Sequence, residues 1–227
     1  MKRDHSTSTI RPRGANVAAG AYPLRRFAAL TPRVIAIGAS TGGPQALSAL
    51  LTRLAPRVHS VPLVVVLHMP TDFTEVVVGQ IAKATGLPTR APTNGEQLKP
   101  GHIYFAPGGV HMKALRIGNS HMLAFSDGPP ENFCKPAVDV LFRSVADSFG
   151  PGALGVVLTG MGSDGLAGAE RIVDAGGSVI AQDEASSAVW GMPGAVARAG
   201  LAAAIAPLDQ LADIISDRLA GARRGVV

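Results

Sequence analysis

Three segments of the sequence each place a residue capable of nucleophilic or acid–base chemistry directly after an apolar run. Ser40 follows "VIAIGA" and lies in Gly-Ala-Ser-Thr-Gly, His68 ends "PLVVVLH", and Asp164 follows "ALGVVLTG". The pattern G-x-S-x-G is typical of a sharp strand-to-helix turn that lifts a serine hydroxyl clear of a sheet, beside helix amides that stabilise an oxyanion. The same letters also fit an ordinary glycine-rich turn, so the serine needs a base.

A regular alternation of strands and helices surrounds these residues. Continuous apolar runs predict buried strands, and apolar residues at helical spacing predict the helices between them. The predicted strands are 33–39, 62–69, 153–160 and 177–182, and the predicted helices are 44–55, 73–86, 135–150, 164–176, 192–200 and 208–224. Residues 101–128 instead favour short hairpins. We therefore predict an α/β fold, with a doubly wound, mainly parallel sheet, helices on both faces and an antiparallel hairpin region.

The carboxyl ends of parallel strands share one edge of a sheet, which is where open α/β sheets build their sites. Ser40, His68 and Asp164 are therefore expected to meet there, as nucleophile, general base and orienting carboxylate. We expect Asp164 to hold the imidazole through its Nδ1–H. His111 also follows a predicted strand and competes with His68 for the role of base, while Asp164 alone equally fits a helix cap.

A second motif points to a different class of protein. Gly160, Gly162 and Gly165 match G-x-G-x-x-G, and Asp183 lies 23 residues beyond the first glycine, as in an NAD(P)-binding Rossmann-like protein. Asp164 disfavours this alternative, because its charge would compete with a pyrophosphate at the helix N-terminus. No His, Cys, Asp or Glu residues show the spacing of a zinc site, so we expect neither a metal nor a cofactor.

The basic character of the chain is concentrated at one end. The first 33 residues hold seven of the 21 Lys and Arg residues and one of the 16 Asp and Glu residues. The remainder is close to neutral, which argues against a nucleic-acid-binding fold. Cys134 is the single cysteine, so no internal disulfide forms and a cytoplasmic protein is expected. No apolar run reaches the roughly 18–20 residues that span a bilayer, so we expect no membrane insertion.

Several strings now stand together in order over residues 34–205: "GASTGGP", "LHMP", "YFAPGGVHM", "KPAVDVLFRSVA", "LTGMGSDG" and "IAQDEASSAVWGMP". Together they closely resemble the catalytic domain of the CheB chemotaxis methylesterase family. The resemblance implies hydrolysis of glutamate γ-methyl esters on the cytoplasmic helical region of chemoreceptors, with release of methanol. Many members of that family also deamidate receptor glutamines, so the resemblance implies this second activity as well. It assigns catalysis to Ser40, His68 and Asp164. The expected substrate and oxyanion vicinity is Thr41, Gly42, Gly43, Met161 and Gly162.

The resemblance starts at the first predicted strand and divides the chain in two. Residues 1–33 are expected to be a disordered basic extension, and residues 34–227 to form the catalytic domain. Thirty-three residues are too few for the receiver domain that typical relatives carry, so a separate receiver protein is an expected regulator. A scaffold that binds receptors without turnover is the remaining non-enzymatic alternative.

Overall fold

A seven-stranded parallel sheet forms the centre of the molecule in the computed structural model, which describes residues 22–221. Its strand order is β3-β4-β2-β1-β7-β8-β9, and every adjacent pair runs parallel. The predicted doubly wound α/β fold is thereby confirmed. The strands are β1 (Val34–Ala39), β2 (Leu63–Leu67), β3 (Thr89–Arg90), β4 (Ile103–Phe105), β7 (Ala153–Val157), β8 (Ser178–Gln182) and β9 (Ala204–Ala206).

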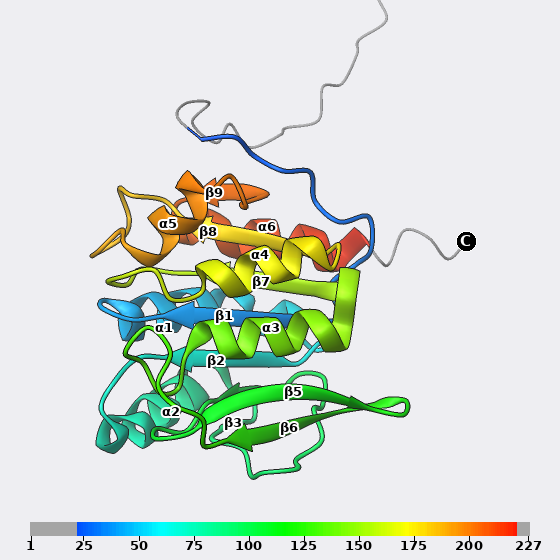
Figure 1. Ribbon diagram of the computed structural model, residues 1–227, viewed down its shortest axis with the longest axis vertical. Helices are drawn as coiled ribbons and strands as arrows, with labels where there is room; N and C mark the ends of the chain where they lie inside the picture. The colour runs from blue at the N-terminus through cyan, green and yellow to red at the C-terminus, as the bar shows by residue number, and fades with distance from the viewer. Residues whose placement is uncertain (1–21, 222–227) are drawn as a thin grey trace, which may run out of the picture.

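Helices cover both faces of this sheet because its central strands are apolar on both sides. Ile35 and Ile37 of β1 belong to one buried cluster, whereas Val34 and Ala36 belong to a second cluster on the opposite face. Figure 1 shows α3 and α4 in front of the sheet and α1 and α6 behind it. The first cluster includes side chains of α1 (Gly43–Leu54), α2 (Thr71–Thr85) and α6 (Leu208–Ala220), and the second includes side chains of α3 (Val138–Phe149), α4 (Leu166–Asp174) and α5 (Met192–Arg198).

The predicted hairpin region contains one hairpin and one strand of the main sheet. Strands β5 (His111–Ile117) and β6 (Ser120–Ser126) pair antiparallel as a separate two-stranded sheet. This hairpin packs on α3, where the Ser144 hydroxyl accepts a hydrogen bond from the Ala114 amide at 2.9 Å. The expectation of hairpins throughout was wrong for β4, which joins the main sheet in parallel because all three of its residues are apolar and buried.

The strand order reverses at β1. The chain passes from β1 to β2 on one side and later returns to β7 on the other side of β1. The register sets Ala39 beside Leu67 and Gly38 beside Val157, so the three strands end almost level. Such a reversal of strand order is where open α/β sheets bind ligands. The residues that follow β1, β2 and β7 therefore face one another.

The described part of the N-terminal segment passes along the β9 edge of the sheet (Figure 1). The Arg25 amide donates to the Ala202 carbonyl at 2.9 Å, and the Ala28 amide donates to the Ser178 hydroxyl at 2.8 Å. Phe27 packs against the core. The domain boundary at residue 33 stays a prediction, and residues 1–21 of the predicted extension lie outside the described residues. Between residues 22 and 221, no helix is both long and apolar enough to cross a membrane.

Candidate active site

Ser40 is held at the turn between β1 and α1 by contacts with two other loops. Its amide donates to the Thr159 carbonyl at 3.0 Å, directly after β7. Gly42 has φ +78°, and a Cβ there would lie 2.6 Å from that of Ala188. Gly160 is equally restricted, since a Cβ would lie 2.8 Å from the Ser40 Cβ. The glycines therefore let three loops converge on the serine.

His68 lies beside this turn, as its position after β2 predicts. Its backbone amide donates to the Ala39 carbonyl at 3.0 Å, which continues the β1–β2 register and sets His68 next to Ser40. The ring Nε2 lies 2.8 Å from Asp164 Oδ2. A carboxylate only accepts hydrogen bonds, so the ring proton is on Nε2 and the lone pair is on Nδ1. The expectation that Asp164 holds Nδ1–H was wrong, because the ring presents its other nitrogen to the acid.

Asp164 is only 2 % exposed and accepts hydrogen bonds at both carboxylate oxygens. Besides His68, its donors include the Val138 amide at 2.7 Å and the Asp139 amide at 3.0 Å, the first two amides of α3. Asp164 thus caps α3, whereas the sequence suggested the helix that follows it. Burial acts to raise the pKa of Asp164, but the hydrogen bonds from His68 and these amides outweigh it and hold the pKa below its ordinary value.

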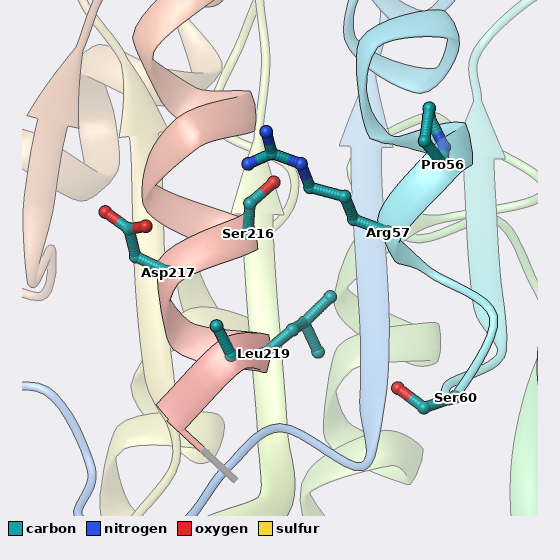
Figure 2. Close-up of a pocket in the computed structure, with 7 residues that line it drawn as sticks. Pro56, Arg57, Ser60, Ser216, Asp217 and Leu219 are labelled. Atoms are coloured by element: carbon teal, nitrogen blue, oxygen red, sulfur yellow. The ribbon is translucent and has the colours of Figure 1, made fainter. Parts of the chain in front are cut away.

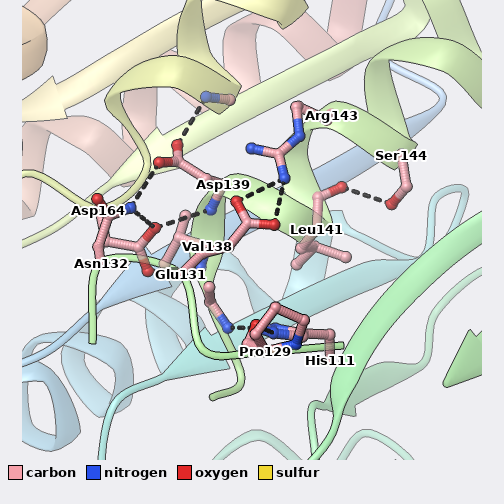
Figure 3. A network of polar contacts seen from close by, with 12 residues as sticks. His111, Pro129, Glu131, Asn132, Val138, Asp139, Leu141, Arg143, Ser144 and Asp164 are labelled. Atoms are coloured by element: carbon pink, nitrogen blue, oxygen red, sulfur yellow. Dashed lines mark hydrogen bonds and ion pairs between the residues drawn. The ribbon is translucent and has the colours of Figure 1, made fainter. Parts of the chain in front are cut away.

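Two further residues support Asp164, and the sequence analysis missed both (Figure 3). The Asn132 side-chain amide donates to Asp164 Oδ1 at 3.1 Å and to Asp139 Oδ2 at 2.8 Å. Asp139 also accepts the Gly168 amide at 2.7 Å, which ties α3 to α4. Burial raises the pKa of Asp139, and the nearby charge of Asp164 adds to this effect. Asn132 therefore joins a buried pair of carboxylates.

A tight turn at Glu131–Cys134 carries Asn132 and places Cys134 against the histidine. Glu131 and Cys134 exchange both backbone hydrogen bonds, at 3.1 and 2.8 Å. Asn132 and Phe133 have φ +51° and +61°, the pattern of a type I′ turn. Cys134 Sγ lies 3.5 Å from His68 Nδ1, and burial raises the pKa of its thiol. Ser40 Oγ makes no hydrogen bond to His68 within the described residues, so the thiol is the contact of Nδ1.

The predicted oxyanion residues lie on the turns that follow β1 and β7, and they differ in what their amides do. The Gly43 amide donates to the Ser40 carbonyl at 2.7 Å and is therefore occupied. The remaining predicted amides donate no hydrogen bond within residues 22–221, as expected near the start of a helix. They belong to Thr41, Gly42, Met161 and Gly162. The Met161 side chain is 74 % exposed, on the loop between β7 and α4.

The competing base is excluded by its own contacts. His111 is 2 % exposed, its Nε2 donates to the Pro129 carbonyl at 2.9 Å, and its Nδ1 accepts the Ala137 amide at 3.1 Å. Neither nitrogen is free for proton transfer. His111 is therefore a structural histidine that fastens β5 to the loop before α3 (Figure 3).

The dinucleotide motif also has contacts that leave little room for a cofactor. Gly160 packs against Ser40 and against the Met192 sulfur, which would lie 2.4 Å from an added Cβ. The Asp164 carboxylate accepts the Gly165 amide at the start of α4, where a pyrophosphate would bind. The loop is therefore packed as part of the Ser-His-Asp site.

A pocket lies elsewhere on the molecule, between the 3₁₀ turn Ala55–Arg57 and α6 (Figure 2). Its lining includes Ser60 and Ser216, but no histidine. Ser60 precedes β2, so this pocket lies toward the amino ends of the strands. This pocket therefore contains none of Ser40, His68 and Asp164.

A parallel α/β sheet with a serine, a histidine and a buried aspartate at one edge places the protein in the class of α/β proteins with a hydrolase-type site. The family model of the CheB methylesterase matches residues 35–215. The chain belongs to the CheB methylesterase family. The chain order Ser, His, Asp also separates it from α/β-hydrolases, in which the acid precedes the histidine.

Relatives with assigned names support this membership. A protein-glutamate methylesterase/protein-glutamine glutaminase of Bradyrhizobium diazoefficiens is 52% identical over 204 residues, covering 90% of this chain and 51% of the relative. One of Rhodospirillum rubrum is 49% identical over 190 residues, covering 83% and 49%. The chain thus spans about half the length of the curated relatives it matches. The crystal structure of the Thermotoga maritima CheB methylesterase catalytic domain has a TM-score of 0.79 at 31% identity, covering 83% of this chain and 99% of that one.

Proposed function

We propose that the chain carries a protein-glutamate methylesterase domain that hydrolyses γ-methyl esters of glutamate on methyl-accepting chemotaxis receptors. Ser40 is the nucleophile, His68 the general base and Asp164 the orienting carboxylate. The observation that carries this proposal is the 2.8 Å contact between His68 Nε2 and Asp164 Oδ2, which leaves Nδ1, contacted by the Cys134 thiol, as the ring nitrogen able to accept the Ser40 proton. The domain is placed at residues 34–227, and control by a separate receiver protein stays a prediction.

The first half of the reaction forms an acyl-enzyme. Ser40 Oγ attacks the ester carbonyl carbon while His68 Nδ1 takes the hydroxyl proton. Asp164 stabilises the imidazolium through Nε2–H. The tetrahedral oxyanion is held by backbone amides of the two glycine-rich turns, those of Thr41, Gly42, Met161 and Gly162. When the intermediate collapses, the ester C–O bond breaks and His68 gives its proton to the methoxide, so methanol leaves.

The second half restores the serine. Water attacks the glutamyl ester of Ser40 and His68 takes a proton from this water. The bond to Ser40 Oγ breaks, and the proton returns to the serine as glutamate is released. The exposed side chains of Met161 and Phe133 lie on the loops that carry Asp164 and Cys134. They suit a site that receives one side chain projecting from a large helical surface.

Deamidation of receptor glutamine is a second candidate activity, favoured by the double name of the relatives from Bradyrhizobium and Rhodospirillum. It uses the same acyl-enzyme, since a glutamine amide differs from a glutamate methyl ester only in its leaving group. His68 would then give its proton to the amide nitrogen as the C–N bond breaks, so ammonia leaves in place of methanol. The two reactions share the nucleophile, so one substitution at Ser40 removes both.

The experiment uses receptor fragments carrying labelled methyl esters and counts volatile methanol. The wild-type chain is compared with Ser40→Ala and with Ser60→Ala, a serine in the pocket of Figure 2. We expect methanol release from wild type and Ser60→Ala, and a loss of about 10³-fold or more in Ser40→Ala. Release by Ser40→Ala at the wild-type rate contradicts the proposal.

Two further measurements separate the alternatives. A scaffold predicts receptor binding without methanol release and no labelling of Ser40 by a serine-directed phosphonate. A dinucleotide-binding protein predicts a rise in melting temperature with NAD(P), and we expect none because the α4 start already holds the Asp164 carboxylate.

A further inference from the structure

Two metal-ligating atoms lie close together beside the buried Asp164, and the esterase reaction does not use them as a pair. His68, Cys134 and Asp164 each offer a ligand atom, and these atoms lie within 4.8 Å of one another. Within residues 22–221, no other group of three or more such side chains comes this close together. We propose that His68 Nδ1 and Cys134 Sγ bind a zinc ion, and that this ion switches off the esterase by occupying the nitrogen that takes the Ser40 proton.

The separation of the two atoms matches a shared tetrahedral zinc. Zinc bonds of about 2.3 Å to sulfur and 2.0–2.1 Å to imidazole nitrogen, at a tetrahedral angle, put the two ligand atoms about 3.5–3.6 Å apart. The observed distance between His68 Nδ1 and Cys134 Sγ is 3.5 Å. Both ligands are held in place, Cys134 by the paired turn with Glu131 and His68 by the bond of its backbone amide to β1.

Asp164 takes part as the partner of the histidine and not as a ligand. Its Oδ2 faces Nε2, on the opposite side of the ring from Nδ1, and its oxygens are already engaged by the Val138, Asp139 and Gly165 amides. Zinc-binding histidines commonly donate their second ring N–H to a carboxylate, which fixes the tautomer and strengthens the ligand. The arrangement that makes His68 a base therefore also makes it a zinc ligand.

The two protein ligands leave the other coordination positions to water. Binding converts the Cys134 thiol to a thiolate, and its proton goes to solvent, with no change in oxidation state. A site with two protein ligands holds zinc more weakly than a structural site with four, so we expect reversible binding at micromolar zinc. Cys134 is partly exposed, which gives the ion a path from solvent.

The binding test uses the untagged full chain, stripped of metal. Zn²⁺ is titrated against a chromophoric chelator, and Co²⁺ is added separately to reveal the near-ultraviolet charge-transfer band of a cobalt–thiolate bond. The variants are Cys134→Ser, Cys134→Ala and the control His102→Gln. The His102 ring bonds to the Pro100 carbonyl and stacks on Tyr104. We expect one zinc per chain and a cobalt–thiolate band in wild type and in His102→Gln. Both Cys134 variants should lose the band and bind zinc at least tenfold more weakly.

The inhibition test rests on the proposed function, while the binding test does not. Zinc should inhibit methanol release by wild type, chelator should restore it, and the half-inhibitory zinc concentration should rise at least tenfold in Cys134→Ser. Each variant is compared with its own metal-free rate. Equal zinc affinity in wild type and both Cys134 variants, together with no cobalt–thiolate band, overturns the inference. If no chain releases methanol while the band still depends on Cys134, the proposed function fails and the metal site stands.

Discussion

Replacing Asp164 by Asn tests whether the carboxylate sets the direction of the imidazole. An amide group has one oxygen and one NH₂, whereas the carboxylate here accepts at both ends. With its oxygen in the Oδ1 position, the new side chain still accepts the Asn132, Asp139 and Gly165 N–H groups. Its NH₂ group then faces the Val138 amide and His68 Nε2. Both are donors in the wild-type arrangement.

The loss of the Val138 contact sets the expected cost in stability. A buried donor without an acceptor costs about 1–3 kcal/mol, and the remaining bonds lose the strength that a charged acceptor gives them. We expect the free energy of unfolding to fall by about 2–4 kcal/mol. His68 avoids its own clash by moving its proton to Nδ1 and accepting from the NH₂ group. With Nδ1 protonated, the ring no longer accepts the Ser40 proton, and methanol release should fall about 10³–10⁴-fold.

Three measurements check this reasoning against a matched control. Urea unfolding gives the stability, methanol release gives the rate, and ¹⁵N NMR of the imidazole reports which nitrogen is protonated. Asp147→Asn alters an exposed carboxylate paired with Arg171, so we expect a change of about 0.5 kcal/mol or less. The Asp164→Asn chain should retain the wild-type tautomer and rate if the carboxylate has no orienting role, and that result refutes the argument.

The same carboxylate predicts a pH dependence of stability. The pKa of Asp164 is lower in the folded chain than its ordinary value, so its contribution is fully present above the pKa of the unfolded chain. It is lost as the pH falls through the native pKa, because the unfolded chain then binds the proton more readily. Urea unfolding of Asp164→Asn should show a smaller loss of stability on acidification than the wild-type chain. An identical acid profile contradicts the assigned direction of the pKa.

Two further predictions concern packing and a second histidine. Gly160→Ala should lower the free energy of unfolding by about 1–3 kcal/mol and slow methanol release, because the added Cβ meets Met192 and Ser40. The control is Gly79→Ala on α2, where the added Cβ meets no other atom, and it should stabilise the chain by about 0.5–1 kcal/mol. Equal effects in urea unfolding contradict the packing argument. Burial lowers the pKa of His121, and the charges of Arg33 and Arg116 add to this effect. The unfolded chain therefore binds the proton more readily, and the free energy of unfolding should decline as the pH falls from 7.5 through the pKa of His121 in the folded chain. Between pH 7.5 and 5, the free energy of unfolding of His121→Gln should decline less than that of the wild-type chain. An equal decline in both chains counts against the lowered pKa of His121.

The sequence was most informative where a strand is buried on both faces. The runs that form β1, β2 and β7 are apolar throughout, so their length and order were enough to place Ser40, His68 and Asp164 at one edge. Strand β9, with the sequence Ala-Ile-Ala, and two-residue β3 carry too short a pattern to be recognised. They add edges to the sheet without altering the site.

The support of the site was beyond the reach of pattern analysis. Asn132 and Cys134 lie in a segment with no periodicity, and their contacts depend on a turn with two residues at positive φ. Asp139 occupies the first turn of α3, where an acidic residue ordinarily suits the helix dipole, so nothing marked it as a partner of Asp164. The nitrogen that His68 gives to Asp164 was wrongly expected because the ring orientation depends on side-chain packing, which spacing along a sequence does not encode.

The two halves of the proposed triad differ in how firmly the fold holds them. Asp164 is fixed before any substrate arrives, since backbone amides of α3 and α4 and the Asn132 amide surround it and His68 is tied to it. The Ser40 hydroxyl turns about a single bond between staggered positions, a motion of picoseconds to nanoseconds in a partly exposed side chain. Completing the triad therefore involves the serine hydroxyl and the Cys134 thiol that contacts His68 Nδ1, with no rearrangement of the buried acid. Rotation of the hydroxyl is about a millionfold or more faster than ordinary enzyme turnover of about 1–10³ s⁻¹, so this rotation does not limit methanol release.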